Sequence, residues 1–193
     1  MIDKIPATKE LSGKIWISRF KGSKEISDLE PTFRFNIENF INALDAARIT
    51  KDIISTYRPL ERSYLMHWCC EIKNGKDAKT IPNMSEVNIE WWHGDQTSSV
   101  DAAQEMFDGF EIDPKNVNCP AEHSKHNTRE AIDMKLTWNG DITIKNASGQ
   151  DVKITTVPRD NTNLDLIKIA KTYSVYHYVP ITDDKKHWSS DGK

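Results

Sequence analysis

The spacing of hydrophobic residues changes in the middle of this chain, from a helical period to a period of two after Ala131. Between residues 33 and 47, apolar side chains recur every three or four positions, which predicts an amphipathic helix. A second helix is expected over residues 59–72, because proline at position 59 suits a first helical turn. A third helix is expected to start at Ser98 or Ser99, whose hydroxyl groups suit an N-cap.

Strict alternation over residues 132–138 predicts a strand with one polar face. Asn139-Gly140 is a strong hairpin signal, so we expect the strand to turn back along residues 142–145. A helix over residues 161–173 and a strand from 175 towards 187 complete this half. Further short strands are expected at 53–55, 87–89 and 152–155. The pattern predicts an α+β fold with helices packed on a central antiparallel sheet.

The chain has 193 residues, which is consistent with a single domain. Residues 1–31 are polar and rich in turns, and they are interpreted as an N-terminal arm with one strand. Residues 32–193 are then expected to form the single domain. Within it, residues 73–125 are expected to be an insertion of loops and a helix that shapes a pocket.

The charge balance gives no sign of a nucleic-acid partner, since the net charge is −3 and the pI is about 6.1. No apolar run approaches the roughly 20 residues that a membrane-spanning helix needs. The first residues lack the charged and then apolar pattern of a signal peptide. We therefore expect synthesis in the cytoplasm, with separate delivery if the substrate lies outside.

The cysteines Cys69, Cys70 and Cys119 do not form a disulfide framework, because two are adjacent and no CxxC spacing occurs. Buried free thiols are the expected state. One bridge from Cys119 to Cys69 or Cys70 is the alternative in an oxidising compartment.

The residues that suggest chemistry are His126, Asp133 and His187. Two imidazoles and one carboxylate form a three-ligand zinc site with one coordination position left for water, which is the layout of a catalytic zinc. Seven extended residues span roughly 23 Å, so the chain must reverse between His126 and Asp133 if both bind one ion. The polar segment 127–130 can make that turn.

A second carboxylate precedes the last histidine and supplies a base for the water. Asp184 is the expected base. Asp183 is the alternative if the spacing between the base and the last histidine is longer by one residue. His123 is an alternative ligand, but its spacing is unspecific. His177, on the last predicted strand, is a candidate substrate contact or a core residue.

Three motifs resemble those of the zinc D-Ala-D-Ala peptidases, the family that shares its fold with Hedgehog signalling domains. Ser124-x-His126-x4-Ala131-x-Asp133 resembles the family motif SxHxxGxAxD. Asp184-x-x-His187 resembles the acid that stands three residues before the last zinc ligand. Ser55-Thr-Tyr57-Arg58-Pro59 resembles an upstream SGYR element. All three occur in the family's order.

The resemblance implies a Hedgehog-type peptidase fold, bound Zn²⁺, and hydrolysis of an amide bond in a peptidoglycan stem peptide or cross-link. It implies that Asp184 is the catalytic acid and base and that Arg58 stabilises the carbonyl oxygen as negative charge develops. It also implies substrate contacts from Ser124 and Tyr57. The resemblance leaves open which bond is cleaved. The activity could be D,D- or L,D-specific, and the enzyme could be an endopeptidase or a carboxypeptidase.

The segments 57–68 and 91–95 resemble a bacterial and phage subgroup that acts on peptidoglycan, with some members that resemble secreted antibacterial toxins. This implies a type VI-like effector, with an immunity protein and a secretion apparatus as partners, or a phage endolysin. Either would act in the periplasm or cell wall of a target cell.

Arg129 replaces the family's glycine, and a positive backbone angle at this position would be costly for arginine. The replacement keeps one alternative open, a catalytically weak zinc-bearing module that binds the cell wall. An intracellular D-Ala-D-Ala dipeptidase is a further alternative.

Overall fold

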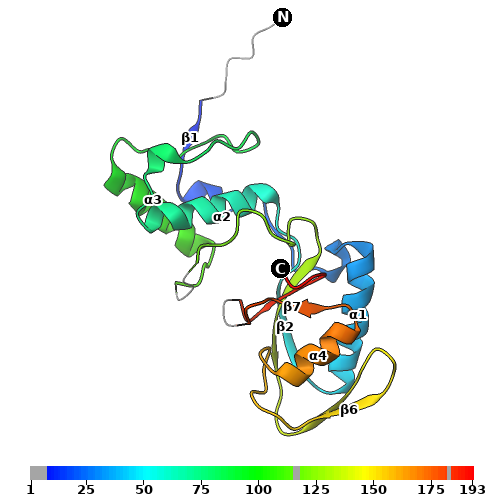
Figure 1. Ribbon diagram of the computed structural model, residues 1–193. Helices are drawn as coiled ribbons and strands as arrows, with labels where there is room; N and C mark the ends of the chain where they lie inside the picture. Colours follow the sequence, from blue (N-terminus) through cyan, green and yellow to red (C-terminus); the bar gives the residue numbers. More distant parts are fainter. Residues whose placement is uncertain (1–7, 115–117, 182–183) are drawn as a thin grey trace, which may run out of the picture. The chain divides into compact units, whose positions relative to one another are not determined.

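The structure is a computed structural model that describes residues 8–114, 118–181 and 184–193 (Figure 1). Contacts between Cα atoms divide the chain into two compact units. Unit 1 comprises Met1–Lys21 and Pro59–His123, and unit 2 comprises Gly22–Arg58 and Ser124–Lys193. This division does not coincide with the boundary predicted at residue 31.

Unit 1 is built on two helices, α2 (Leu60–Lys73) and α3 (Gln96–Gly109). Their apolar faces share one buried cluster, which includes Tyr64, Leu65 and Met106. Two single-turn 3₁₀ helices, η1 (Lys14–Trp16) and η3 (Ala78–Thr80), and a parallel pair of two-residue strands, β1 (Glu10–Leu11) and β3 (Ile89–Glu90), surround the helices.

The N-cap of α3 differs from the prediction. Asp95 is the cap, and its carboxylate accepts a hydrogen bond of 2.8 Å from the backbone N–H of Ser98. The predicted cap residues lie within the first turn, where the Ser99 hydroxyl donates to the Asp95 carbonyl oxygen. Aspartate is as favourable as serine at the N-cap position, and several polar residues in succession made the first residue of α3 ambiguous in the sequence.

A disulfide joins Cys70 of α2 to Cys119, whereas Cys69 is a buried free thiol. The expectation of free thiols is therefore wrong for Cys70 and Cys119 and correct for Cys69. Loss of solvent raises the pKa of the Cys69 thiol to about 12, which removes the reactive thiolate at neutral pH.

We predict that iodoacetamide at mildly alkaline pH modifies no cysteine of the folded protein, because two are oxidised and the third is buried and protonated. Reduction and unfolding should expose all three. Intact mass measured before and after these steps checks the result, and one alkylated site in the native protein would contradict it.

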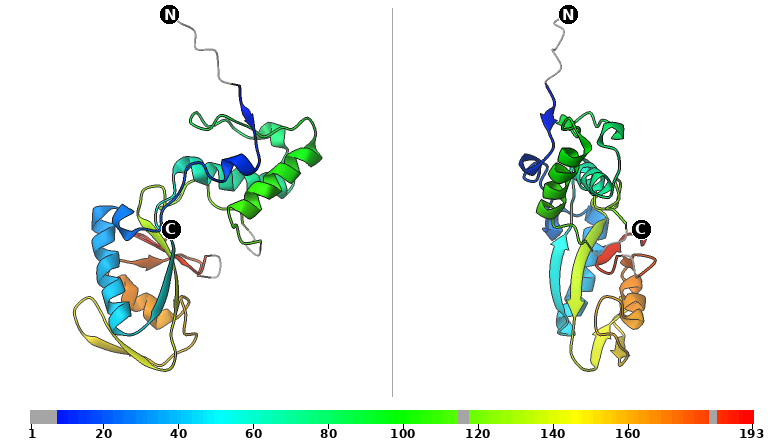
Figure 2. Two further views of the ribbon diagram at one scale, coloured as in Figure 1. Left: turned by 180° about the vertical axis from the view of Figure 1, so that it is seen from behind. Right: turned by 90° about the vertical axis from the view of Figure 1, so that its left-hand side faces the viewer.

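Unit 2 contains a four-stranded antiparallel sheet in the order β2 (Thr50–Ser55), β4 (Ala131–Thr137), β8 (His187–Ser189) and β7 (Tyr176–His177). Two helices, α1 (Pro31–Ala46) and α4 (Leu164–Thr172), lie next to each other beside the sheet (Figure 2). A short 3₁₀ helix, η2 (Ile26–Asp28), precedes α1. The predicted α+β class, with helices on an antiparallel sheet, is confirmed.

The core of unit 2 follows the predicted hydrophobic spacing. Every second residue of β4 (Ile132, Met134 and Leu136) is fully buried in one cluster with the apolar faces of α1 and α4. Asp133 lies between two of these residues, so its side chain projects from the opposite face of the sheet. The alternation that buries the core therefore also presents this carboxylate.

The hairpin predicted at Asn139-Gly140 is wrong. The strand β5 (Ile142–Lys145) pairs with β6 (Asp151–Ile154) in a separate two-stranded sheet, not with β4. One edge of β4 is paired with β2. Along the other edge β8 pairs only with Ala131–Asp133, and next to the turn the backbone of β4 is hydrogen-bonded by Asn161 and Arg159. The local turn signal is therefore overridden by longer-range pairing.

The last predicted strand is also shorter than expected. It ends at His177, and a separate strand, β8, begins at His187 and inserts between β7 and β4. No helix in the described part of the chain combines the length and apolar character that crossing a membrane requires.

Candidate metal centre

The candidate metal centre lies in unit 2, where β4 and β8 run side by side. Asp133 and His187 are direct cross-strand partners, so their side chains leave the same face of the sheet. His126 belongs to the turn that precedes β4, and its ring is fixed against the end of β2 by a bond of 3.0 Å between Nδ1 and the Thr56 carbonyl oxygen. Sheet pairing and one turn bring the three residues together.

The three side chains converge on one oxygen atom. His126 Nε2 lies 3.1 Å from Asp133 Oδ1, and His187 Nδ1 lies 3.2 Å from the same oxygen. One potential ligand atom from each residue lies within 4.8 Å of the others. Both histidines are buried, whereas the Asp133 side chain retains 15% exposure. The predicted metal ligands therefore form one buried group with limited access to solvent.

The remaining ring nitrogens fix the orientation of both imidazoles. His126 Nδ1 faces the Thr56 carbonyl oxygen, and His187 Nε2 lies 3.1 Å from the Lys193 carbonyl oxygen. A carbonyl oxygen only accepts, so each of these nitrogens carries the proton. In the neutral rings, His126 Nε2 and His187 Nδ1 then direct their lone pairs at the Asp133 carboxylate. A proton or a bound metal cation between these atoms would relieve the repulsion of the lone pairs.

The electrostatics agree with this arrangement. Burial alone would raise the pKa of Asp133, but the charges and hydrogen bonds of His126 and His187 outweigh it and lower that pKa. Burial opposes the charged form of His187, but the bond to Asp133 and its charge raise the pKa of the imidazole above the ordinary value. In the metal-free protein the raised pKa favours the protonated form of His187, and a metal that binds Nδ1 would displace that proton.

We predict that metal affinity rises with pH through the pKa of His187, by about tenfold per pH unit while one proton is released. In the metal-free protein the proton on His187 contributes stability at low pH, and this contribution is lost as pH rises through the raised pKa. Competition titrations with a chromophoric chelator between about pH 5 and pH 8 check the slope. An affinity independent of pH would contradict this protonation state.

Asp184 lies in the loop just before β8. Its carboxylate accepts a hydrogen bond from the Lys186 N–H at 3.3 Å, and its backbone carbonyl oxygen accepts from the His187 N–H at 3.4 Å. Desolvation and the negative charge of Asp133 raise the pKa of Asp184, although the residue as a whole is exposed. Asp184 thus interacts electrostatically with the candidate metal ligands. The alternative base, Asp183, lies outside the described residues.

His177 is buried on the core side of the sheet and packs edge-on against Trp188. Its Nδ1 lies 3.0 Å from the Tyr178 carbonyl oxygen and its Nε2 lies 3.0 Å from the Lys185 carbonyl oxygen. Both nitrogens are therefore engaged by the backbone. The geometry favours a role of His177 in holding the loop that carries Asp184, rather than the predicted contact with substrate.

Arg58 is anchored to the ligand-bearing turn through its backbone. Its N–H donates to the His126 carbonyl oxygen at 3.2 Å, and its carbonyl oxygen accepts from the Asn127 side chain at 2.9 Å. Within the described ranges, no hydrogen bond or ion pair engages the guanidinium group. The charge of Arg58 is thus available near the turn.

The hydroxyl group of Ser124 is buried and lacks a hydrogen-bond partner among the described residues. The neighbouring backbone is fixed, because the Ser124 N–H donates to the Asn127 side chain at 2.7 Å. The guanidinium group of Arg129 lies over the ring of Tyr57, with its Cζ atom 4.1 Å from the ring centroid. Neither contact assigns a substrate role to Ser124 or Tyr57.

Arg129 adopts a φ of +66°, the left-handed conformation that favours glycine. Its guanidinium group stacks on Tyr57 and donates to the Asp28 carbonyl oxygen at 3.1 Å. These contacts offset part of the backbone strain, and the ligand-bearing turn keeps the positive angle that the family's glycine suggested.

A tight turn after β8 was not predicted from the sequence. The Ser189 hydroxyl oxygen accepts hydrogen bonds from the N–H groups of Gly192 at 2.9 Å and Lys193 at 3.1 Å. This turn places the Lys193 carbonyl oxygen against His187 Nε2. A serine two residues after the last ligand, followed by a glycine with a φ of +80°, is the signal that could have revealed it.

We predict that Ser189→Ala lowers divalent-metal affinity by about 10- to 100-fold, the usual effect of losing an outer partner of a ligand. The change removes the acceptor of the Gly192 N–H and one of the two acceptors of the Lys193 N–H, the other being Asp191, so the turn holds His187 less firmly. Calorimetric titration with zinc checks the result, with Ser190→Ala as the neighbouring control. Equal affinities of the two variants would contradict a positioning role for Ser189.

No protein-family model matches the chain, and no curated protein matches its sequence. Among solved structures, the chain is similar to the vancomycin resistance D,D-pentapeptidase VanY from a VanB-type resistance cassette, in complex with Zn(II). The identity is 14% and the TM-score is 0.41, over 94% of this chain and 86% of that chain.

Proposed function

We propose that this protein is a zinc-dependent peptidase that hydrolyses an amide bond in the stem peptide or cross-link of peptidoglycan. One observation carries the proposal: two imidazole nitrogens and one carboxylate oxygen lie within 4.8 Å of one another. A further carboxylate, Asp184, interacts electrostatically with all three residues. A metal and a base together can activate a water molecule to hydrolyse an unactivated amide.

The donor set fits zinc. Imidazole nitrogen and carboxylate oxygen are ordinary zinc ligands, and a set of three leaves a position for water or substrate. Each histidine donates its other N–H to a backbone carbonyl group, as ligating histidines usually do. Zinc bound there would polarise the scissile carbonyl group and make a water molecule more acidic.

The protein's own groups would carry the remaining steps. Asp184 takes the proton from the attacking water and delivers it to the leaving amine, and its raised pKa brings it closer to the range in which it can do both. Arg58 directs its guanidinium group at the carbonyl oxygen as negative charge develops, with its backbone fixed to the turn of His126. Ser124 offers a hydroxyl group without a partner to a polar group of the substrate.

The ordered resemblance of the three motifs supports peptidoglycan as the substrate. The Cys70–Cys119 disulfide supports action in an oxidising compartment such as the bacterial periplasm. We propose delivery to a target cell, as a type VI-like effector with an immunity protein or as a phage lysin. Expression in a bacterial host separates the compartments: a periplasmic export signal should make the protein lytic, whereas cytoplasmic expression should leave cells intact.

The direct test is incubation of the purified protein with zinc and soluble muropeptides, followed by mass spectrometry. We expect products that differ from the substrate by the loss of one residue or by one cleaved cross-link. The masses of the products identify the bond that was hydrolysed. Retained binding to intact walls without any product would favour the binding module that Arg129 suggests. Cleavage of free D-Ala-D-Ala alone would favour the dipeptidase.

A further inference from the structure

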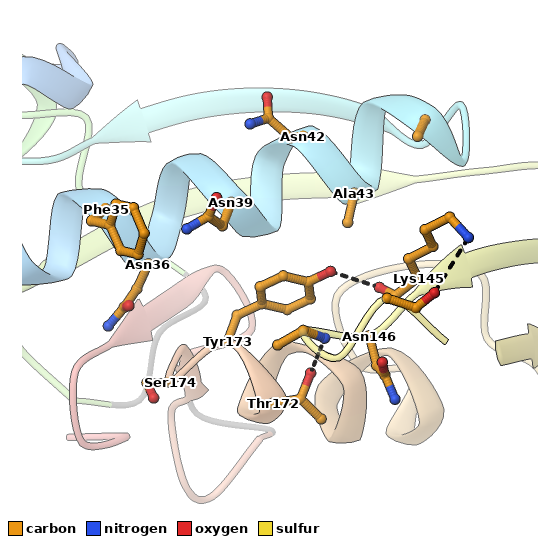
Figure 3. Close-up of a pocket in the computed structure, with 13 residues that line it drawn as sticks. Phe35, Asn36, Asn39, Asn42, Ala43, Lys145, Asn146, Thr172, Tyr173 and Ser174 are labelled. Carbon is orange, nitrogen blue, oxygen red and sulfur yellow. Dashed lines mark hydrogen bonds between the residues drawn. The ribbon is translucent and has the colours of Figure 1, made fainter. Parts of the chain in front are cut away.

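A cavity of about 620 Å³ opens between α1, the β5–β6 hairpin and the end of α4 (Figure 3). Its lining includes Phe35, Asn36 and Asn39 from α1, and Lys145 and Tyr173 from the facing elements. None of the candidate metal ligands lines this cavity. The proposed chemistry therefore assigns no role to it.

The walls of the cavity are fixed by hydrogen bonds. The Tyr173 hydroxyl group donates to the Lys145 carbonyl oxygen at 2.8 Å, and the Ala147 N–H donates to Thr172 Oγ1 at 3.0 Å. These bonds, drawn as dashed lines in Figure 3, tie the hairpin to the end of α4. The cavity is thus formed before any ligand arrives, which reduces the entropic cost of binding.

The wall of the cavity formed by α1 contains two side-chain amide groups that make no hydrogen bond with the described part of the protein. Asn36 and Asn39 are half-buried, yet in the part of the chain that the structure describes their amide groups have no hydrogen-bond partner. Asparagine is a poor residue for a helix interior, because its side chain competes with backbone hydrogen bonds. Helix stability therefore does not explain these two residues.

An aromatic ring lies beside the amides. Phe35 is 65% exposed and is adjacent in sequence to Asn36, so its ring is available for stacking. The Lys145 ammonium group is paired with Asp151 at 2.8 Å, which leaves the cavity without a free charge from that residue. A neutral ligand with hydroxyl and amide groups and an apolar face matches these features, as an N-acetylated sugar does.

We propose that this cavity is a glycan subsite that binds N-acetylated sugars of the wall polymer while the metal centre acts on the attached peptide. The proposal rests on the proposed function for its ligand class. The amides of Asn36 and Asn39 bond the hydroxyl and acetamido groups, and Phe35 stacks on a sugar face.

The test uses the full chain, stripped of metal, and an oligosaccharide of N-acetylglucosamine, which carries no stem peptide. Binding is followed by NMR through the side-chain amide signals of Asn36 and Asn39. We expect saturable shifts of these signals, and about tenfold weaker binding in each of Phe35→Ala and Asn39→Ala. Glu38→Ala is the control, because Glu38 is an exposed residue of the same helix and does not line the cavity.

Three results would overturn the subsite. One is the absence of binding by the wild type, and another is binding that Asn39→Ala and Phe35→Ala leave unchanged. Shifts caused by a free stem peptide and not by the sugar would also overturn it, in favour of a peptide site. Because the assay needs neither zinc nor cleavage, its failure is distinct from failure of the muropeptide assay.

Discussion

Asp184→Asn is expected to lower the rate of muropeptide hydrolysis by about 10²- to 10⁴-fold, the usual contribution of a positioned acid or base. Asparagine keeps the size of the side chain and the bond from the Lys186 N–H, but it cannot take up a proton. The metal ligands are untouched, so zinc content should equal that of the wild type. Rates from liquid chromatography and zinc content from elemental analysis of the same sample measure both effects.

The matched control is Asp141→Asn, an exposed carboxylate just before β5 in the same unit. It should hydrolyse muropeptides at the wild-type rate. If Asp184→Asn retained full activity with full zinc content, Asp184 would not be the base, and its proposed role would have to be abandoned.

Asp133→Ala is expected to weaken zinc binding by about two to three orders of magnitude, since the ~10–16 kcal/mol of a four-ligand zinc site corresponds to about 2.5–4 kcal/mol per ligand. The carboxylate is the group on which both imidazoles converge, so its removal leaves two neutral nitrogens without a charged partner. Hydrolysis should be lost at ordinary zinc concentrations. Competition with a chelator of known affinity gives the change.

The corresponding control is Asp52→Ala, an exposed residue of β2 in the same sheet. It should bind zinc as the wild type does. Circular dichroism of both variants separates a lost ligand from a lost fold, and unchanged zinc affinity in folded Asp133→Ala would place the ion elsewhere.

The half of the site on β4 could be predicted because one alternating pattern determines both core and site. Ile132 and Met134 had to point inwards, so Asp133 had to point to the other face. The partner strand could not be predicted, because a three-residue strand at His187 carries too little pattern of its own. Its position between β4 and β7 depends on pairing across more than fifty residues of sequence.

The wrong hairpin has the same origin. Asn139-Gly140 makes a turn, with a positive φ at Gly140, but Asn161 and Arg159 occupy the edge of β4 that β5 would have used. A local signal identifies the turn and not the partner of the next strand. The positive φ at Arg129 shows the opposite case, in which the motif spacing indicated a backbone angle that the residue itself disfavours.

Contacts made by the backbone were invisible in the sequence. The backbone oxygens of Thr56 and Lys193 orient the two imidazoles, and any residue type supplies a backbone oxygen. The pairing of Cys70 with Cys119, rather than Cys69, likewise follows from which face of α2 each cysteine occupies. From the cysteine positions in the sequence, one could conclude only that a single disulfide bond from Cys119 was possible.

The central claim is that His126, Asp133 and His187 hold one divalent ion. The most direct measurement is a crystal structure of the zinc-loaded protein with anomalous data collected at the zinc edge. The account predicts one strong anomalous peak bonded to His126 Nε2, an Asp133 carboxylate oxygen and His187 Nδ1. A peak at other residues, or none at saturating zinc with these side chains ordered, would contradict it.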